Sequence, residues 1–368
     1  MQPGRLVFFV GAIAVALVSS QRRNAAYPED TTNIITELIN GISVIIDNKS
    51  HLEEFTTALY QQIPLPLNGK KVLITGATRG LGRGIAAHFR ALGADLYLPC
   101  RTIPKGLETQ LDEDADMLVS LHSGAGKEMN RGHVYIWHMD LGNLNSIDAA
   151  VLQLKKQIPL ASIDILINNA GLISPFGNLT KQGFEMSFGV NFLGTARFTL
   201  QLIEIGLLKN QARIVSVSSE DHRASRRLNS TGAAFGAPWS TGVADTMERY
   251  AYSKLAQTTF FTHLALVERD FVILDICPGP VASDIARGVG VITDIATFFM
   301  EWLFQSKFKA ALPILQLSIA PQFQTKSGKH FHMAAERPAR SDAIDPLEGE
   351  ILSRLTRSLL ADRRAPTK

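Results

Sequence analysis

From Lys70 onward the chain alternates short apolar runs with longer segments of helical periodicity. The apolar runs are of the kind that is buried on both faces of a parallel sheet. Strands joined through helices in this way imply an α/β fold, with a doubly wound parallel sheet and helices on both of its faces. We expect strands at 71–75, 95–99, 133–139, 163–168, 213–218 and 271–276, and helices near 80–92, 105–121, 143–157, 180–208 and 250–269.

A glycine-rich segment, "TGATRGLGRG", follows the first of these strands. It places Gly76, Gly80 and Gly82 where the strand turns into a helix. Glycine there lets the backbone approach a pyrophosphate, and the helix N-terminus supplies N–H donors and positive potential. The spacing G-x-x-x-G-x-G differs from the G-x-G-x-x-G of the common dinucleotide fingerprint. A purely structural turn is the alternative interpretation.

Two arginines bear on which nucleotide this turn would hold. Arg79 lies within the turn, and Arg101 follows the second strand, where an acidic residue would otherwise bind the ribose 2′-hydroxyl. Two cations and no carboxylate favour a 2′-phosphate, hence NADP(H). The alternative is that both are solvated surface residues. Asp140 follows the third strand and is placed to contact an adenine ring, or else to cap the helix starting near Asn143.

The stretch "RYAYSKLAQTTFF" contains two tyrosines and one lysine on an expected helix. Tyr250 and Lys254 are four residues apart, so their side chains emerge on one helical face, one turn apart. Tyr252 is rotated by roughly 160° from Tyr250 and does not share that face. Such a spacing also occurs by chance, so its weight depends on the motifs around it.

The N-terminus carries an apolar run of about 15 residues in "RLVFFVGAIAVALVSSQRR". As a helix it would span ~22 Å, short of the ~30 Å hydrocarbon core of a bilayer. We expect residues 1–23 to be a membrane anchor, with a cleaved signal segment as the alternative. Arg22 and Arg23, on the C-terminal side of the run, favour a cytosolic location of the domain that follows.

The remainder of the chain divides at a change of pattern. Isoleucines and leucines at near-helical spacing predict a helical extension over residues 24–69. The segment "PLPLNG" at 64–69 breaks that pattern and marks a boundary. We assign 70–335 to the main domain and 336–368 to a C-terminal helical tail.

Composition excludes several classes of protein. A chain with 46% hydrophobic and 19% charged residues is ordinary for a folded globular protein, and a net charge of +3 does not indicate nucleic-acid binding. Two cysteines, Cys100 and Cys277, argue against a disulfide-stapled secreted scaffold. No Cys/His group has metal-ligand spacing, and His330 and His332 are interpreted as same-face neighbours on a strand. We therefore expect no metal site.

Seven motifs, in order, resemble the short-chain dehydrogenase/reductase family and its Rossmann-like fold. They span roughly residues 70 to 335, and each lies at the end of a strand or helix. The segments "FGVNFLG" and "SGKHF" look most like the retinol dehydrogenase branch, which has membrane-anchored members and is typically NADP-preferring. The motifs are "TGATRGLG" at 75–82, "DL" at 140–141, "NNAG" at 168–171, Asn191, "VSS" at 217–219, "YAYSK" at 250–254 and "PGPV" at 278–281.

The resemblance implies a role for each matching residue. Tyr250 would exchange a proton with the reacting oxygen, and Lys254 would lower the tyrosine pKa and reach the nicotinamide ribose. Ser219 would polarise a carbonyl, with Ser218 as the alternative, and Asn191 would sustain a proton relay to Lys254 through water. Cofactor contacts are expected at Gly76, Thr78, Arg79, Gly80, Leu81, Gly82, Arg101, Asp140, Leu141, Asn169, Ala170, Gly171, Tyr250, Lys254, Pro278, Gly279, Val281 and Ser283.

The sequence therefore predicts an NADP(H)-dependent oxidoreductase that interconverts a lipophilic alcohol (retinoid, steroid or another lipid) and its aldehyde or ketone. The alternative is a cofactor-binding but catalytically weak scaffold or regulatory homologue. We expect attachment to a membrane through the N-terminal segment, at the endoplasmic reticulum and facing the cytosol, with the secretory lumen as second choice. No nucleic-acid partner is expected, and a homo-oligomer is left open. The loop 220–249 is expected to contribute to the substrate pocket. The segment 294–308 suits a hydrophobic pocket wall, a membrane-contacting lid or a plain core helix.

Overall fold

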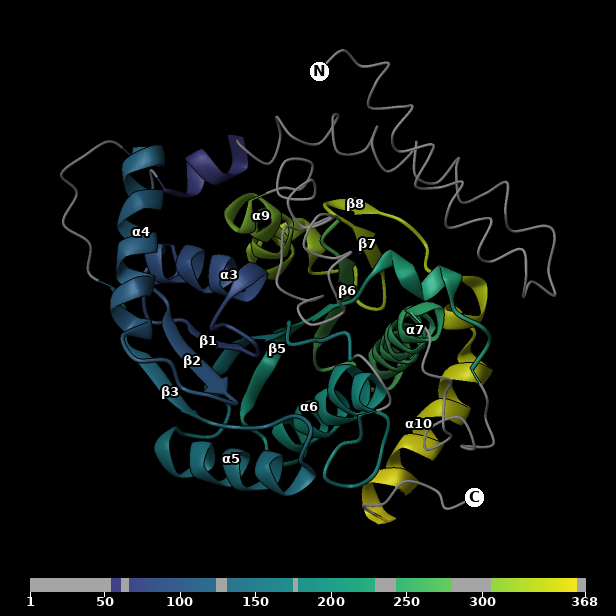
Figure 1. Ribbon diagram of the computed structural model, residues 1–368. Helices are drawn as coiled ribbons and strands as arrows, with labels where there is room; N and C mark the ends of the chain where they lie inside the picture. Colours follow the sequence, from purple (N-terminus) through teal and green to yellow (C-terminus); the bar gives the residue numbers. More distant parts are fainter. Residues whose placement is uncertain are drawn as a thin grey trace. The chain divides into compact units, whose positions relative to one another are not determined.

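An eight-stranded sheet forms the centre of the fold in the computed structural model, which describes residues 54–60, 66–123, 131–174, 178–228, 243–279 and 306–362. The strand order is β3-β2-β1-β4-β5-β6-β7-β8, and every pair is parallel except β7 with β8. This confirms the doubly wound α/β fold (Figure 1). The strands are β1 Lys71–Ile74, β2 Asp95–Cys100, β3 Val134–His138, β4 Ile163–Asn168, β5 Leu208–Val217, β6 Val272–Cys277, β7 His330–His332 and β8 Ala335–Glu336.

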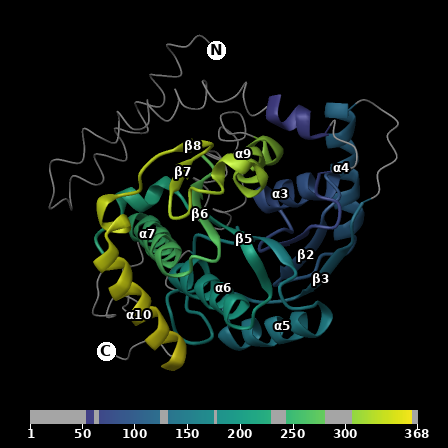
Figure 2. The same ribbon diagram turned by 180° about the vertical axis from the view of Figure 1, so that it is seen from behind.

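Helices cover both faces of this sheet, as the view from behind also shows (Figure 2). The face covered by α3, α4 and α9 buries one apolar cluster, and the face covered by α5, α6 and α7 buries a second one. The last helix, α10, packs against α7. The helices are α3 Gly80–Ala91, α4 Leu107–Ser123, α5 Leu144–Gln157, a π-helix η1 Phe188–Gly194, α6 Thr195–Glu204, α7 Val243–Val267, α9 Lys307–Ile319 and α10 Pro346–Asp362, with short 3₁₀ turns η2 Glu220–Ala224, η4 Pro321–Phe323 and η5 Ser341–Ile344.

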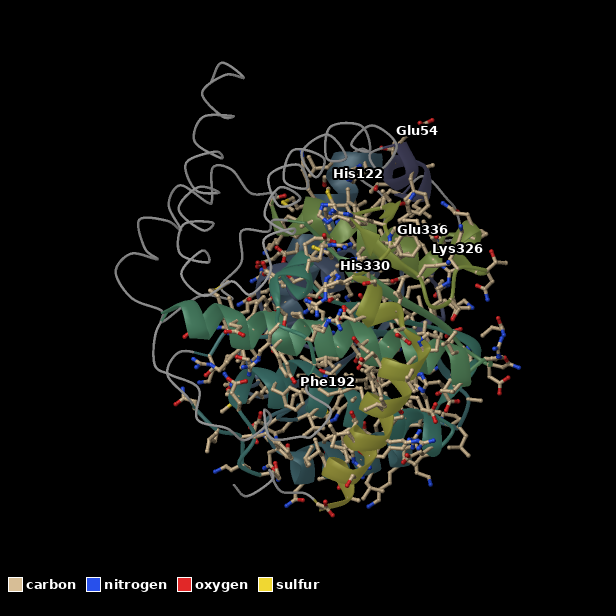
Figure 3. All side chains as sticks on the ribbon, turned by 90° about the vertical axis from the view of Figure 1, so that its right-hand side faces the viewer. Glu54, His122, Phe192, Lys326, His330 and Glu336 are labelled. Carbon is tan, nitrogen blue, oxygen red and sulfur yellow. The ribbon has the colours of Figure 1, made fainter. Side chains whose placement is uncertain are left out.

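Aromatic side chains pack in the interior, whereas charged side chains lie at the margin of the sheet. Phe192, in the π-helix, is fully buried and packs edge-to-face on Phe260 of α7, with ring centroids 5.6 Å apart. At the sheet margin, Lys326 forms an ion pair of 2.7 Å with Glu336 of β8, and both are exposed (Figure 3). The apolar runs that predict the strands lie beneath the helices, and most of their residues are buried.

Several boundaries differ from the sequence-based expectation. The helix expected over 180–208 divides into the π-helix and α6, and Gly206, at φ +69°, lies in the turn that leads to β5. β5 begins five residues before the expected 213, at Leu208, because Leu208 pairs with Ile163. Residues 209–211 are polar and interrupt the apolar pattern, so the sequence does not indicate that the strand begins at Leu208. α9 was not expected, since Pro313 in its interior is a residue that usually ends helices.

The strand order reverses between β1 and β4, which extend the sheet in opposite directions. In open α/β sheets the crevice at such a switch point is where ligands bind, at the carboxyl ends of the strands. Within the described residues, no helix is both long enough and apolar enough to span a bilayer. The segment expected to be an anchor, residues 1–23, and most of the helical extension 24–69 lie outside those residues.

Candidate active site

The glycine-rich turn joins the ends of β1 and β4 at the switch point. Thr75 Oγ1 accepts hydrogen bonds from the backbone N–H groups of Asn169 and Ala170, at 3.1 and 3.0 Å. In return, Asn169 Nδ2 donates to Thr75 O at 3.0 Å and to Gly76 O at 3.3 Å. These bonds hold the turn against the "NNAG" segment and leave Ala170 and Gly171 at the rim of the crevice.

Two glycines make this turn tight. Gly76 has φ +71°, a left-handed conformation that favours glycine. A Cβ on Gly82 would collide with the carbonyl oxygen of Gly76, so only glycine allows α3 to begin this close to β1. Because the first turn of α3 contains no acidic residue, its N–H groups and positive dipole end remain suited to an anion. Thr78 and Leu81, on the same turn, are half-buried.

Two arginines follow neighbouring strands, Arg79 in the turn after β1 and Arg101 directly after β2. Arg79 and Arg101 are exposed, and neither has an ion pair or hydrogen bond with another described residue. Asp140 accepts a hydrogen bond from Gly142 N at 2.9 Å, so its carboxylate braces the turn after β3. The N-cap of α5 is instead Asn143, so Asp140 does not cap that helix. Leu141, beside it, is buried.

Tyr250 and Lys254 lie one turn apart on α7, and both are buried. Lys254 Nζ is 5.9 Å from the centre of the Tyr250 ring. The ammonium group donates to Val217 O at 2.8 Å and to Gln257 Oε1 at 2.9 Å. Tyr252, by contrast, is buried in the apolar cluster beside Phe188, with ring centroids 6.3 Å apart.

The two serines after β5 have different surroundings. Ser218 is buried, and its hydroxyl shares a 2.6 Å hydrogen bond with Thr258 of α7. Ser219 is half-buried, and its hydroxyl lies close enough to Tyr250 to lower the pKa of that phenol. Its hydroxyl also donates to Asp221 Oδ2 at 2.9 Å. The fold therefore brings Ser219 and Tyr250 together, while Ser218 faces the interior.

Asn191 sits in the π-helix and holds the segment that follows "NNAG". Its Nδ2 donates to Leu172 O at 2.9 Å, and its Oδ1 accepts from Leu172 N at 2.8 Å. Nδ2 also donates to Ser253 Oγ on α7, at 2.9 Å. A Cβ added to Gly171 would lie 3.5 Å from both Asn191 Oδ1 and Lys254 Nζ, so these two groups flank the same glycine. π-Helical turns are rare in proteins and occur frequently at functional sites.

The electrostatics of Tyr250 differ from the sequence-based expectation that Lys254 lowers its pKa. Burial, and then the charge of Asp221, raise the pKa of Tyr250, against a smaller opposing effect of the Ser219 hydrogen bond. Burial also lowers the pKa of Lys254 to about 8, opposed by Asp275, Cys277 and Asp221. Burial is the largest cause of the raised Tyr250 pKa, and the Lys254 ammonium, 5.9 Å from the ring centre, donates its hydrogen bonds to Val217 and Gln257. In this structure the tyrosine is a protonated phenol at neutral pH.

Three residues of this site were not anticipated. Thr75 opens the glycine-rich motif and makes the hydrogen bonds that join β1 to β4. Gln257 lies three residues after Lys254, on the same helical face, and also donates to Ser216 Oγ. Asp221 follows Ser219 by two residues, and burial raises the pKa of its carboxyl. In the sequence, each of them lies within or up to three residues from a recognised motif, and that proximity is the signal that could have identified it.

The loop after β6 is described only at its start. Pro278 is buried, and Gly279 has φ +78°. Val281 and Ser283, expected to contact the nicotinamide, lie outside the described residues, as do 229–242 and 280–305. The described part of this site therefore comprises a turn suited to a pyrophosphate, two exposed arginines, and a Ser-Tyr-Lys group in which Tyr250 and Lys254 are buried. A nicotinamide dinucleotide fits this set of features.

Comparisons with known proteins agree with this geometry. The family model for short chain dehydrogenase matches residues 70–234. Retinol dehydrogenase 14 of Mus musculus is 31% identical over 288 residues, which cover 76% of this chain and 82% of that protein. Retinol dehydrogenase 13 of Homo sapiens is 29% identical, covering 75% of this chain and 80% of its own. Polyprenol dehydrogenase of Homo sapiens is also 29% identical, with 74% and 79% covered.

Solved structures show the same fold at lower sequence identity. A 3-oxoacyl-[acyl-carrier protein] reductase from Brucella melitensis, in complex with NAD, gives a TM-score of 0.53 at 21% identity and covers 72% of this chain and 96% of its own. A blue fluorescent protein from a metagenomic library, in complex with NADPH, gives a TM-score of 0.52 at 22% identity, with the same shares covered.

Proposed function

Because the chain belongs to the short-chain dehydrogenase/reductase family, in its retinol dehydrogenase-like branch, we propose that it uses NADP(H) to interconvert a lipophilic alcohol and its aldehyde or ketone. It is an oxidoreductase of CH–OH groups that works with a nicotinamide cofactor. The observation that carries the finer proposal is the grouping of Ser219, Tyr250 and Lys254 at the carboxyl edge of the sheet.

The choice of NADP(H) rests on Arg79 and Arg101. Both are exposed at the crevice end of the sheet, and neither is neutralised by another described residue. Arginine binds phosphate oxygens with charge-assisted, often bidentate hydrogen bonds, so the pair would hold the 2′-phosphate. No carboxylate occupies position 101, where one would favour the free ribose 2′-hydroxyl of NAD(H).

The bound nicotinamide supplies or accepts the hydride. Tyr250, a phenol whose pKa burial raises, donates its proton to the oxygen of a carbonyl substrate when the reaction runs as a reduction. Ser219 donates a hydrogen bond to the same oxygen and stabilises the negative charge that develops there. For oxidation of an alcohol the proton moves the other way, and Tyr250 must first become a phenolate.

Lys254 and Asn191 supply the surroundings of that proton transfer. The pKa of Lys254, lowered to about 8, leaves the amine mostly charged at neutral pH but able to give up a proton. Its ammonium group lies beside the Tyr250 ring and is oriented by Gln257. Asn191 flanks the same glycine as Lys254 and would return protons to it through water.

A lipophilic substrate is proposed because the relatives named above are dehydrogenases of retinol and polyprenol. The substrate class is a retinoid, a steroid or another lipid carbonyl. Residues 1–23 would anchor the chain in the endoplasmic reticulum membrane, where such substrates partition. Protease protection in intact microsomes tests this placement. Digestion of the catalytic domain from outside is the expected result, and full protection would instead place that domain in the lumen.

The decisive test is NADPH oxidation by the purified full-length chain with retinals, ketosteroids and long-chain lipid aldehydes. We expect turnover with at least one lipid carbonyl, and faster turnover with NADPH than with NADH at equal concentration. Binding of NADPH without turnover of any substrate, in either direction, would reject the proposal in favour of the catalytically weak alternative.

A further inference from the structure

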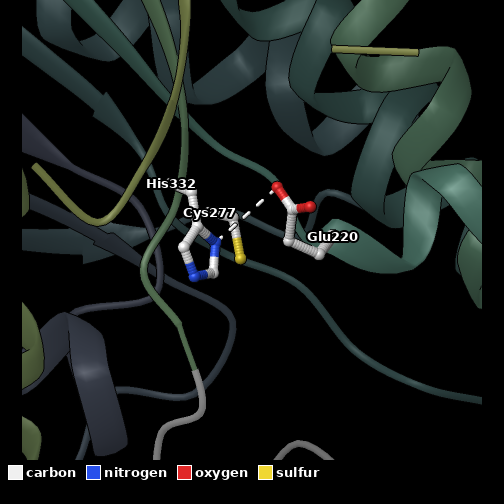
Figure 4. Close-up of side chains that lie close together, drawn as sticks. All are labelled: Glu220, Cys277 and His332. Atoms are coloured by element: carbon white, nitrogen blue, oxygen red, sulfur yellow. Dashed lines mark ion pairs between the residues drawn. The ribbon is translucent and has the colours of Figure 1, made fainter. Parts of the chain in front are cut away.

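Three potential metal ligands meet beside the active site, at the ends of three neighbouring strands. Glu220 follows β5 and comes directly after Ser219, Cys277 is the last residue of β6, and His332 is the last residue of β7. Because β5, β6 and β7 are adjacent and parallel, their ends lie at one edge of the sheet. One carboxylate oxygen, the sulfur and one ring nitrogen all lie within 4.8 Å of one another, and the side chains converge (Figure 4).

The His332 imidazole is held in an environment that does not satisfy it. Its side chain is 9% exposed, and its Nδ1 is buried without a hydrogen-bond partner in the described part of the chain. The nearest acidic atom, Glu220 Oε1, is 3.6 Å away, which is too far for a hydrogen bond. A buried nitrogen without a partner costs on the order of 1–3 kcal/mol. Nδ1 is therefore free of a hydrogen bond, and a neutral imidazole with its proton on Nε2 would present a lone pair there to a cation.

The other two ligands are already oriented by their neighbours. Glu220 Oε2 accepts from Arg223 Nε at 2.7 Å and from Arg337 Nη1 at 2.8 Å. Oε1 is shared, since it bonds His330 Nε2 at 3.1 Å and lies 3.6 Å from His332 Nδ1. Cys277 is buried, which raises the pKa of its thiol to about 12, against a smaller lowering by the backbone groups of Gly279 and Glu220. Hydrogen bonds of this kind around the ligands are typical of metal sites, where they orient the ligands and stabilise their charged forms.

A second group, Glu220 with His222 and His330, is equally close but is already satisfied. His330 bonds Asp275 Oδ2 through Nδ1, at 2.6 Å, and Glu220 Oε1 through Nε2, at 3.1 Å. His222 bonds Ser219 O through Nδ1, at 2.7 Å, and accepts Arg340 N at Nε2, at 3.3 Å. Every ring nitrogen of this second group has a partner, so it has no lone pair left for a cation.

We propose that Glu220, Cys277 and His332 form a binding site for a zinc-class divalent cation. Sulfur, imidazole nitrogen and carboxylate oxygen are the ligands that Zn²⁺ takes in proteins. Bonds of roughly 2.0–2.3 Å in a tetrahedron give ligand–ligand separations of roughly 3.3–3.8 Å, and the 3.6 Å between Glu220 and His332 falls in this range. Binding forms the metal–sulfur bond as the Cys277 thiol releases its proton to solvent. Three protein ligands leave one coordination position open.

Such an ion would tie together the three strands next to the catalytic serine. It would link Glu220, adjacent to Ser219, to Cys277, which precedes the Pro278–Gly279 turn. The three ligands are more than 50 positions apart in the chain, which is why spacing along the sequence did not reveal them. The inference concerns metal binding alone, so it stands or falls independently of the proposed activity.

The test uses the full chain, freed of metal with a chelator, dialysed and titrated with Co²⁺. A cobalt–thiolate bond gives an intense near-ultraviolet charge-transfer band, and tetrahedral Co²⁺ gives visible d–d bands. We expect both bands to saturate at equimolar Co²⁺ and to disappear on addition of Zn²⁺. Cys277→Ser should abolish the charge-transfer band. Cys100→Ser, which changes the other buried free cysteine, should retain it.

Absence of the band in the unsubstituted chain, or its persistence in Cys277→Ser, would overturn the proposal. If Cys277→Ser does not fold, Glu220→Gln takes its place, because it keeps the volume of the side chain and its hydrogen bonding to the arginines through an amide oxygen. This variant should bind Co²⁺ about tenfold more weakly or worse. Unchanged Co²⁺ affinity in that variant would count against the site equally.

Discussion

Two regions at the carboxyl edge of the sheet are built on different principles. Where β1 and β4 end, the site consists of backbone groups and of missing side chains, as at Gly76 and Gly82. Where β5, β6 and α7 meet, it consists of polar side chains, namely the half-buried Ser219 and the buried Tyr250 and Lys254. The first region suits a cofactor whose phosphates bind N–H groups. The second suits proton transfer, which depends on pKa values.

The difference also determines what each region tolerates. In the backbone region an added methyl group is the damaging change, because atoms are already in contact. In the side-chain region the shape can remain intact while the loss of one hydroxyl or one charge removes the function. Substitutions in each region should therefore separate cofactor binding from turnover.

The largest effect is expected from Tyr250→Phe, which removes one hydroxyl from the side-chain region. Loss of the proton donor should lower turnover by about 10²–10⁴-fold. NADPH affinity, measured by fluorescence titration, should change little because the glycine-rich turn is untouched. Tyr252→Phe removes a hydroxyl from the neighbouring buried tyrosine and should keep its turnover. Full activity in Tyr250→Phe would contradict the assignment of proton transfer to the side-chain region.

The next effect is a pH dependence of stability that originates at Lys254. Its pKa falls from the ordinary 10.5 to about 8 on folding, because burial disfavours the ammonium despite Asp275, Cys277 and Asp221. Between these pH values the unfolded chain binds more protons, so the free energy of unfolding should rise with pH across that window. The full rise is about 3 kcal/mol. Urea unfolding at about pH 8 and at about pH 10.5 measures this rise, and Lys254→Met should lack it. The same rise in the free energy of unfolding in both proteins would contradict the assignment to Lys254.

Two alanine substitutions in α3 test the region built from backbone groups. A Cβ at Gly82 would meet the Gly76 carbonyl, and a Cβ at Gly84 would meet the Lys307 carbonyl of α9. Both should lower the free energy of unfolding by about 1–3 kcal/mol. Only Gly82→Ala should also weaken NADPH binding, since only that clash displaces the turn. Equal loss of NADPH affinity in both variants would indicate a general loss of structure instead.

The smallest effect is expected at the adenosine end of the cofactor. Arg101→Asp should shift the preference for NADPH over NADH by about tenfold, or about 1.4 kcal/mol, measured as a ratio of kcat/KM values. Lys105→Asp makes the same charge change at another exposed position and should leave the ratio unchanged. A ratio that does not respond to Arg101→Asp would remove the role given to that arginine.

The difference between local and long-range features explains how much of the fold and of the site could be predicted from the sequence. The strands and the glycine-rich turn are local patterns, and the fold follows from their order. The face shared by Tyr250 and Lys254 also follows from helical geometry alone. The direction of Lys254 does not, because it depends on Gln257 and on the end of β5. Nor does the meeting of Glu220, Cys277 and His332, which requires the register of three strands.

The short strand β8 has a consequence for the chain in a crowded solution. A parallel sheet that ended at β7 would present a row of unpaired backbone groups, a template on which another chain could aggregate. β8 covers that row in the antiparallel direction and has only two residues. Glu336 there pairs with Lys326 and Lys329, so charge surrounds this margin of the sheet. The edge is therefore protected against edge-to-edge growth by its length and by its charge.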